Sequence, residues 1–371
     1  MNEKGWQPRL LAVGVVMTIS AALAWWGQPA PSQPSDSGAS APPPEPRLTS
    51  QATLSAGVVQ LMVSGNAALA RGGRAETQQA RAAFEQAILR DERYAPAHAG
   101  LAAALVGLAS SGWDVPDTVL PLAVTHADRA IELDPTLALA WQALAQAEVQ
   151  LKRDWPRAEM HYRRAISLAP ESGAAALLAR LLLATGRRDD AIAESLAALK
   201  LEPGSADRQA STGIVHRFAG RPSEALPYFE QALSLRPGQR SAAVWRAVTL
   251  ADLGRLDEAL SALPSEDEQA ADAAPWVAGY VRALRGNRAA AEEVFNALGT
   301  RATQEYVPSV QFAYLARALG ERDQALAWIE SSVRQHSPWI DLIAVDPTFH
   351  SLRGEPRFKS ALAAMQLAPA R

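Results

Sequence analysis

Cysteine is absent from all 371 residues of the chain. Its absence excludes a disulfide, a zinc–thiolate site, a thiol nucleophile and a lipid anchor on cysteine. Aromatic residues make up only 6%, and neither charge sign dominates, since the formal net charge is −3 and the pI is near 6.1. This balance argues against a nucleic acid partner bound through bulk electrostatics.

The sequence also lacks the short motifs that carry catalysis or cofactor binding. It has no glycine-rich phosphate loop with a following Lys-Ser or Lys-Thr, no GxSxG elbow and no HExxH motif. No two histidines have metal-ligand spacing with a carboxylate. We therefore predict no catalytic residue, no metal and no cofactor. An enzyme would need two or more of His126, His161, Glu148 and Asp154 to meet in a deep pocket.

One hydrophobic run stands out near the amino terminus. Leu10 to Trp26 is uncharged and spans about 26 Å as a helix, close to the roughly 30 Å of a bilayer core. Lys4 and Arg9 precede the run, and the first basic residue after it is Arg47. The positive-inside rule then predicts a cytoplasmic amino terminus at 1–9, a transmembrane anchor at 10–27 and an exported remainder. We expect a single-pass protein of the bacterial inner membrane with its bulk in the periplasm.

Two alternatives to this anchor stay open. Ala22-Leu23-Ala24 resembles a signal-peptidase site, and cleavage there would release a secreted soluble protein. The reverse orientation would leave the bulk in the cytoplasm, although the charge bias disfavours it. Residues 28–47 follow, with seven prolines between Gln28 and Pro46. Such a segment favours polyproline II geometry and is predicted to be a linker.

The rest of the chain carries two interlocked repeats of about thirty-four residues. The first consists of glycines, each followed five residues later by alanine, at Gly186, Gly220, Gly254, Gly286 and Gly320. The second consists of prolines, each after an Ala-Ile/Leu-x-Leu pattern, at Pro135, Pro170, Pro203 and Pro237. Each repeat predicts a helical hairpin, because glycine caps the first helix in a left-handed conformation and proline ends the second. Aromatic residues between the alanines are expected to fill the gaps between repeats: Phe84, Tyr162, Phe229 and Phe295.

This spacing of Gly, Ala, aromatic, Ala and Pro resembles the tetratricopeptide repeat. The resemblance implies an all-α fold, a right-handed superhelix (α-solenoid) of about eight hairpins over residues 48–337. It also implies a concave groove lined by the first helix of each hairpin. Pro264 is expected to cut short the helix that begins at Leu256.

The pattern changes after Pro338, and residues 338–371 are predicted to cap the last hairpin with Phe349, Leu352, Phe358 and Leu362. This tail looks like the closing segment of repeat regions in bacterial membrane-spanning winged-helix regulators, adenylate cyclases and serine/threonine kinases. Because only nine residues precede the apolar run, no such output domain is expected here. The resemblance implies a sensor-like or scaffolding module that acts through other proteins.

The candidate partner-binding residues lie on first helices and are expected to face the groove. Arginine forks and aromatic faces are favoured in protein recognition. The set is Gln142, Gln146, Arg180, Arg217, Trp276, Tyr280, Tyr314 and Arg317. Relatives that grip chaperone tails use Lys, Asn and Arg on successive first helices, and the central copies have no asparagine there. We therefore expect a protein or peptide ligand of another kind, held by a non-catalytic scaffold.

Overall fold

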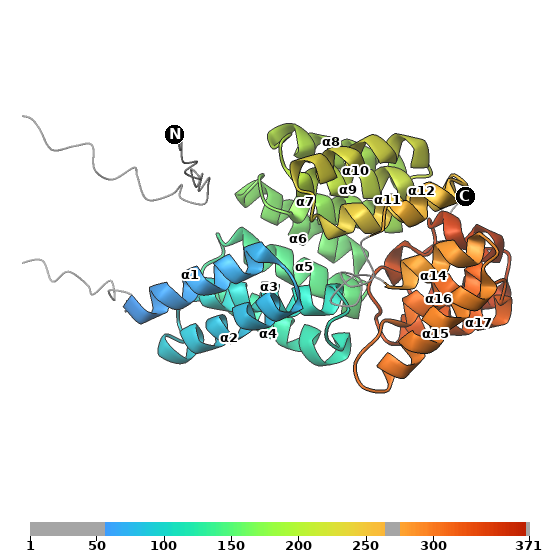
Figure 1. Ribbon diagram of the computed structural model, residues 1–371. Coiled ribbons are helices and arrows are strands. Elements are labelled where there is room, and N and C mark those ends of the chain that lie inside the picture. The colour runs from blue at the N-terminus through green and yellow to red at the C-terminus, as the bar shows by residue number, and fades with distance from the viewer. Residues whose placement is uncertain (1–55, 264–274, 369–371) are drawn as a thin grey trace, which may run out of the picture. The chain divides into compact units, whose positions relative to one another are not determined.

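The computed structural model of the chain describes residues 56–263 and 275–368 (Figure 1). The anchor and linker predicted at 10–27 and 28–47 lie outside these ranges. Within them, no helix is both long enough and apolar enough to cross a bilayer. The described part belongs to one compact unit, and its regular elements are all helical, with no strand in either range.

Sixteen of the helices in the described ranges form eight consecutive hairpins. The pairs are α1 (Ala56–Arg71) with α2 (Arg74–Arg90), α3 (Ala95–Ser110) with α4 (Pro116–Leu133), α5 (Ala138–Leu151) with α6 (Trp155–Leu168), α7 (Ala174–Ala184) with α8 (Arg188–Leu201), α9 (Ala206–Phe218) with α10 (Pro222–Leu235), α11 (Arg240–Asp252) with α12 (Leu256–Ser261), α14 (Pro275–Leu284) with α15 (Arg288–Ala302), and α16 (Ser309–Ala318) with α17 (Arg322–Arg334). Two short 3-10 helices, η1 (Ile340–Leu342) and η2 (Pro347–Leu352), and a final helix, α18 (Pro356–Ala364), follow.

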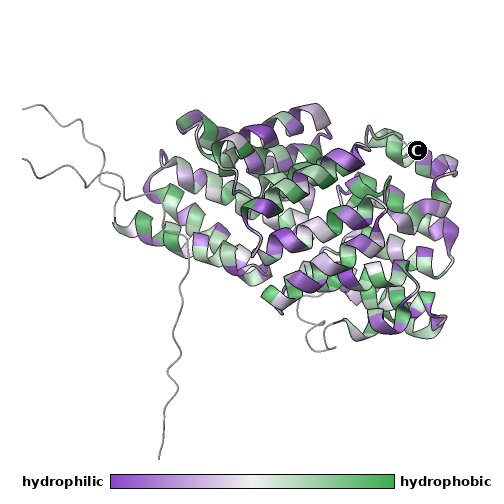
Figure 2. Ribbon diagram, turned by 90° about the horizontal axis from the view of Figure 1, so that it is seen from above, coloured by the Kyte–Doolittle hydropathy of each residue, from purple (hydrophilic) through white to green (hydrophobic). Residues whose placement is uncertain are grey.

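The first helices of neighbouring hairpins contact one another and form an inner layer. α3 packs on α5, α7 on α9, and α14 on α16. Hydrophobic and hydrophilic residues alternate along the helices (Figure 2), the pattern of helices that bury an apolar face. Stacked hairpins that each bury one such stripe against the next are the arrangement of an α-solenoid.

The glycines of the repeat end the first helices as their spacing predicts. Gly186 and Gly220 have φ angles of +83° and +85°, in the left-handed region. The other three glycines of the series share this conformation. A residue with a Cβ would be strained there, which is why the position recurs as glycine. The α12 helix ends at Ser261, before Pro264, as also predicted.

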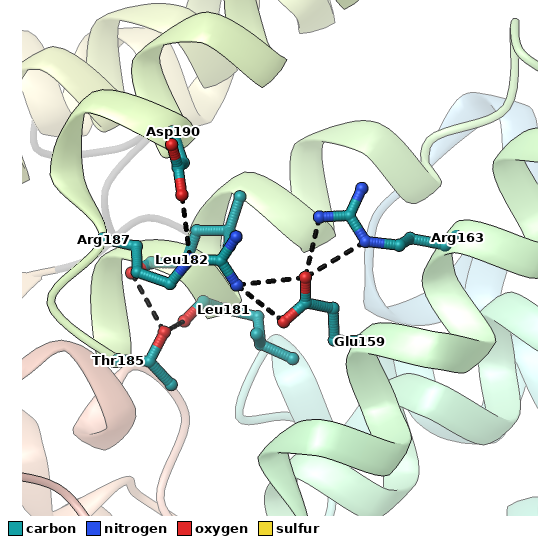
Figure 3. Close-up of polar contacts among 7 residues, drawn as sticks. All are labelled: Glu159, Arg163, Leu181, Leu182, Thr185, Arg187 and Asp190. Atoms are coloured by element: carbon teal, nitrogen blue, oxygen red, sulfur yellow. Dashed lines mark hydrogen bonds and ion pairs between the residues drawn. The ribbon is translucent and has the colours of Figure 1, made fainter.

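Two of the arginines that follow these glycines, Arg187 and Arg221, pair with the preceding hairpin, and Figure 3 shows the contacts of Arg187. Arg187 donates from Nη1 to Glu159 of α6 at 2.8 and 3.0 Å, and from Nε to Asp190 at 2.8 Å. Arg221 lies directly before α10, the second helix of the next hairpin. Its Nη2 donates back to Asp189 of α8 at 3.3 Å. These ion pairs lie at the surface, so each of them adds little stability.

Aromatic side chains pack tightly between helices, and the closest packing is against glycines: Phe84 of α2 lies against Gly100 of α3 in the next hairpin, whereas Phe229 packs within its own hairpin. Phe229 of α10 is fully buried, and a Cβ on Gly213 of α9 would lie 2.7 Å from its ring. We expect Gly213→Ala to lower the free energy of unfolding in urea by about 1–3 kcal/mol, because the ring has no room to move. Gly204→Ala, where a Cβ meets nothing within 4 Å, is the control. Equal losses in the two variants would contradict this account of the packing.

Candidate functional site: an inner groove filled by the chain's own segment

The chain turns back on itself after α17, and residues 337–352, here the groove segment, pack against the inner layer. His336 and Trp339 have φ angles of 51° and 69°, which reverse the direction of the backbone. η1 then packs against α7 and α17, and η2 against α16. The apolar side chains of the segment are almost completely buried: Ile340, Leu342, Ile343, Ala344, Val345, Phe349 and Leu352.

Arg180 of α7 binds the first carboxylate of the groove segment. Its Nε donates to Oδ2 of Asp341 at 2.7 Å, and its Nη2 donates to the other carboxylate oxygen. The guanidinium also lies 4.2 Å from the ring centroid of Trp339, a cation–π contact. Burial disfavours the charged guanidinium, but the Asp341 carboxylate more than offsets this and raises the pKa of Arg180. Arg180 is therefore a fixed cation paired within the chain.

Arg217 of α9 binds the second carboxylate. Its side chain has no exposed surface, and its Nε donates to Asp252 of α11 at 2.7 Å. Its Nη2 donates to Asp346 at 3.2 Å, and the backbone N–H of Thr348 caps the same carboxylate at 2.9 Å. The hydroxyl of Tyr314 donates to the other oxygen of Asp346. Asp346 is thus the hub of a buried network that joins α9, α16 and η2.

Charge is not balanced inside this network, because two carboxylates surround one guanidinium. Burial raises the pKa of Asp252, and Asp346 adds to this effect while Arg217 opposes it. The ion pair of Arg217 with Asp252 survives burial through its short hydrogen bond. The network therefore depends on every partner being present.

Aromatic residues complete the contact with the groove segment and leave one hollow. Trp276 stacks on Tyr314 at 4.6 Å between ring centroids, and the Tyr280 hydroxyl lies 3.4 Å from Thr348 Oγ1. Beside them is a cavity of about 150 Å³. It is lined by Ser110, Ser111, Val244, Trp245, Trp276, Pro308, Val310, Gln311, Tyr314, Pro338 and Trp339.

The structure therefore brings four of the predicted groove residues onto the chain's own segment: Arg180, Arg217, Tyr280 and Tyr314. Trp276 lines the hollow, and Gln146 donates to Ser110 Oγ at 2.8 Å. Gln142 is partly exposed on α5. Arg317 lines a separate cavity at the last hairpin. Contact of the eight predicted groove residues with another protein stays a prediction. Five of them already form hydrogen bonds within the chain: Arg180, Arg217, Tyr280, Tyr314 and Gln146.

Sequence reasoning missed the residues that engage them, above all Asp341, Asp346 and Thr348. A signal was present, because Asp341 and Asp346 flank the apolar run Leu-Ile-Ala-Val. Carboxylates within so apolar a stretch are buried only when a cation or several donors accompany them. The tail also has a wider role than a cap: α18 packs on α17, while the groove segment runs along helices of earlier hairpins.

Two of the residues named for an enzymatic alternative do meet. His161 Nδ1 lies 2.8 Å from Glu148 Oε2, and Arg157 Nε lies 3.0 Å from the other oxygen. Glu148 has no exposed surface and His161 is only 5% exposed. A substrate therefore has no access to this pair, which is a buried contact between α5 and α6. In the described ranges, no group of three or more His, Asp or Glu residues could hold a metal ion.

A second histidine pair gives a pH-dependent contact. His98 donates from Nε2 to the carbonyl of Glu92 at 2.9 Å, so its Nδ1 accepts from Nδ1 of His126 at 3.0 Å. Burial, and next the His98 imidazole, lower the pKa of His126. Because the folded pKa lies below the unfolded one, stability is complete above about pH 6.5 and falls as the pH drops below it.

We expect His126→Asn to lose less stability than the unmodified chain between about pH 7 and about pH 5, since asparagine keeps a donor for His98 but does not titrate. Urea midpoints measured at both pH values test this. Replacement of the partly exposed His336 by asparagine serves as the control. An identical pH dependence in the unmodified chain and in His126→Asn would contradict the assignment.

Stacked helical hairpins with a groove along their first helices define the class of α-solenoid repeat proteins. A family model described as "Tetratricopeptide repeat" matches residues 219–279, from the turn after α9 into α14. Over these residues the chain matches the tetratricopeptide repeat that the spacing indicated. Comparison with curated protein sequences gives no match.

Solved structures also resemble the chain. The human IFIT1 dimer with m7Gppp-AAAA has a TM-score of 0.56 at 16% identity, covering 75% of this chain and 72% of that one. An IFIT1 monomeric mutant with Gppp-AAAA has a TM-score of 0.57 at 15% identity, covering 83% and 71%. The thermophilic TPR protein TTC0263 of Thermus thermophilus gives 0.45 at 20% identity, covering 52% and 99%. Identities this low show the fold alone.

Proposed function

We propose that the chain is a non-catalytic protein-interaction scaffold, or sensor module, with its repeats in the bacterial periplasm. The observation that carries this proposal is that the inner groove already holds a polypeptide segment. It does so with two guanidinium–carboxylate pairs, Arg180–Asp341 and Arg217–Asp346, and with aromatic contacts. These are the interactions that give protein interfaces their affinity and orientation.

The groove segment leaves part of the inner face open to a partner. The hollow beside Trp276 and Tyr314 is bordered by apolar and aromatic side chains, with Gln311 at its polar edge. Its volume of about 150 Å³ accepts one apolar side chain of a partner rather than a whole peptide. An anchoring side chain in this hollow, surrounded by polar contacts at the rim, is the binding mode that we propose.

The membrane placement rests on the sequence. We propose that residues 10–27 anchor the chain in the inner membrane, with 1–9 in the cytoplasm, and that the linker at 28–47 holds the repeats away from the bilayer. Cleavage after Ala24 would instead release a secreted binding protein. Fractionation with amino-terminal sequencing distinguishes the two, because only the anchored form keeps Leu10–Trp26. An enzymatic function has no support in the closed Glu148–His161 pair.

Site-specific crosslinking in cells tests the scaffold function. A photoreactive residue at Gln311 lies beside the hollow, whereas one at Met160 of α6 lies on an exposed position away from it. We expect Gln311 to give a discrete adduct with one envelope protein and Met160 to give none of that adduct. The same adducts from both positions, or none from Gln311, would count against a partner at this face.

A further inference from the structure

Arg217 and Arg317 occupy the same position in two different repeats. Each stands three residues before the glycine that ends its first helix, Gly220 and Gly320 respectively. The two glycines have φ angles of +85° and +82°, so the local backbone is the same in both turns. The repeat therefore supplies an internal comparison between two equivalent arginines.

Their surroundings differ in what pairs with the guanidinium. Arg217 holds one carboxylate from the first helix of the following hairpin, Asp252, and one from the groove segment, Asp346, and only its Nη1 lacks an acceptor in the described ranges. Arg317 belongs to α16 in the last of the eight hairpins, so no following first helix is there to bring a carboxylate. Its Nε is buried but has no hydrogen-bond acceptor among the residues that the structure describes. A buried donor in this state is a desolvated group that still lacks its acceptor.

A cavity of about 240 Å³ lies at this position. It is lined by Arg317, Gly320, Arg322, Ser351 and Leu352, between the α16–α17 turn and the end of η2. Glu355 pairs with Arg322 and neutralises one of its two arginines. Ser351 is exposed and offers a hydroxyl donor at the same place. The cavity is thus lined by donors and carries a net positive charge.

Neighbouring residues add to that charge. Arg353 follows the lining residues Ser351 and Leu352, and its Nε is also buried without an acceptor in the described part of the chain. Burial, and next the positive charge of Arg188, lower the pKa of Arg353, while Asp346 opposes the shift only in part. Positive charges that depress one another's pKa in this way are a favourable environment for an anion.

We propose that this cavity at the last hairpin binds a carboxylate of an acidic residue on the partner polypeptide, with the Arg317 guanidinium as its main donor. This inference rests on the proposed function and names the chemistry of its partner. The partner supplies from outside the pairing that Asp252 supplies from within the chain at Arg217. A guanidinium fork matches a carboxylate with two parallel hydrogen bonds, which fixes the orientation of the bound residue.

A pair of capped tripeptides tests this on the purified full-length chain in detergent. The probes are Ac-Gly-Asp-Gly-NH2, its Asn counterpart and inorganic phosphate, all at matched ionic strength. At about ten times its Kd, the Asp peptide is expected to raise Tm by about 2–4 °C. Arg317→Gln should abolish this rise. Arg334→Gln, which removes an exposed arginine of α17, should retain it.

Each other outcome has a defined meaning. An equal rise with the Asn peptide, no rise with the Asp peptide, or a full rise in Arg317→Gln would overturn the proposal. A rise with phosphate as large as that with the Asp peptide would overturn the assignment to carboxylate. Each variant is compared with itself, with and without peptide, so a loss of intrinsic stability in Arg317→Gln does not affect the result.

The Gln311 crosslink separates failure of this site from failure of the scaffold function. If the adduct forms in cells but the Asp peptide has no effect, the carboxylate site is wrong and the scaffold stands. If the Asp peptide stabilises the chain through Arg317 but no adduct forms, the site stands and the scaffold function fails. If both hold, Arg317→Gln should reduce the yield of the adduct about tenfold or more, as loss of a paired guanidinium does at interfaces.

Discussion

A chain that ends at His336 is expected to lose the folded inner layer between α7 and α16, a larger effect than any single substitution discussed here. The truncation removes the groove segment, whose apolar side chains are nearly all buried. It exposes Tyr280 and Tyr314 to water and leaves Arg180 and Arg217 without the carboxylates of the segment. Each large apolar side chain contributes about 1.5–3 kcal/mol when fully buried, and an orphaned buried cation costs more than one of them.

Hydrogen exchange with mass spectrometry shows where the loss falls. We expect the amides of α9, α11, α14 and α16 to exchange at least about a thousandfold faster, equivalent to about 4 kcal/mol of local opening. Hairpins such as α1–α2 should be affected much less, because repeats are stabilised mainly by their neighbours. A chain that ends at Leu352 is the matched control: it lacks α18 but keeps the groove segment. Protection of α9 that is equal in both truncations would contradict the role given to the segment.

The repeat architecture was predictable because its determinants are local and recur. A left-handed glycine, a close-packed alanine and a terminal proline each act within one hairpin, and the regular spacing aligns the copies. Gly186 and Gly220 accordingly have the conformation that the spacing requires. Phe84 lies between the first two hairpins for the same reason, against Gly65 and Gly100. Each of these elements follows from residues within its own repeat and the next one, about seventy residues of sequence.

The groove segment could not be predicted in this way, because its contacts join distant parts of the chain. Arg180 and Asp341 are 161 residues apart, and Arg217 and Asp346 are 129 apart. A repeat pattern gives the direction in which Arg180 points but not what occupies the space in front of it. The repeat pattern ends after Pro338. The position of the groove segment therefore depends on the shape and charge of the assembled inner layer, against which it packs.

The same limit applies to the candidate site. Sequence reasoning treated Arg217 and Arg317 alike, as arginines on first helices, and the structure separates them by their partners. Arg217 is fully buried and paired with two carboxylates, whereas Arg317 borders a cavity and has no carboxylate partner in the described ranges. Each of the two has one buried donor without an acceptor there, Nη1 in Arg217 and Nε in Arg317. The difference arises from position in the array: one arginine has a following hairpin and the other does not.

The second large effect is expected for Asp346→Ala. The substitution removes the acceptor for Arg217 Nη2, for the Tyr314 hydroxyl and for the backbone N–H of Thr348, all of them buried. We expect the free energy of unfolding in urea to fall by about 3–5 kcal/mol, because three buried donors lose their acceptor at once, although Arg217 keeps its pair with Asp252. Asp323→Ala is the matched control, since that side chain is 94% exposed and 3.9 Å from Arg357. Its effect should stay within about 0.5 kcal/mol.

A double-mutant cycle separates the ion pair from the shape of the site. Arg217→Met alone leaves Asp346 and Asp252 buried without their cation, and should be as damaging as Asp346→Ala. Arg217→Met combined with Asp346→Leu removes both charges and keeps the volume filled, so its cost should be well below the sum of the two single changes. Full recovery is not expected, because Asp252 stays buried without Arg217. Strictly additive costs would mean that the Arg217–Asp346 ion pair contributes nothing beyond its separate residues. The groove segment would then be held by its apolar side chains alone.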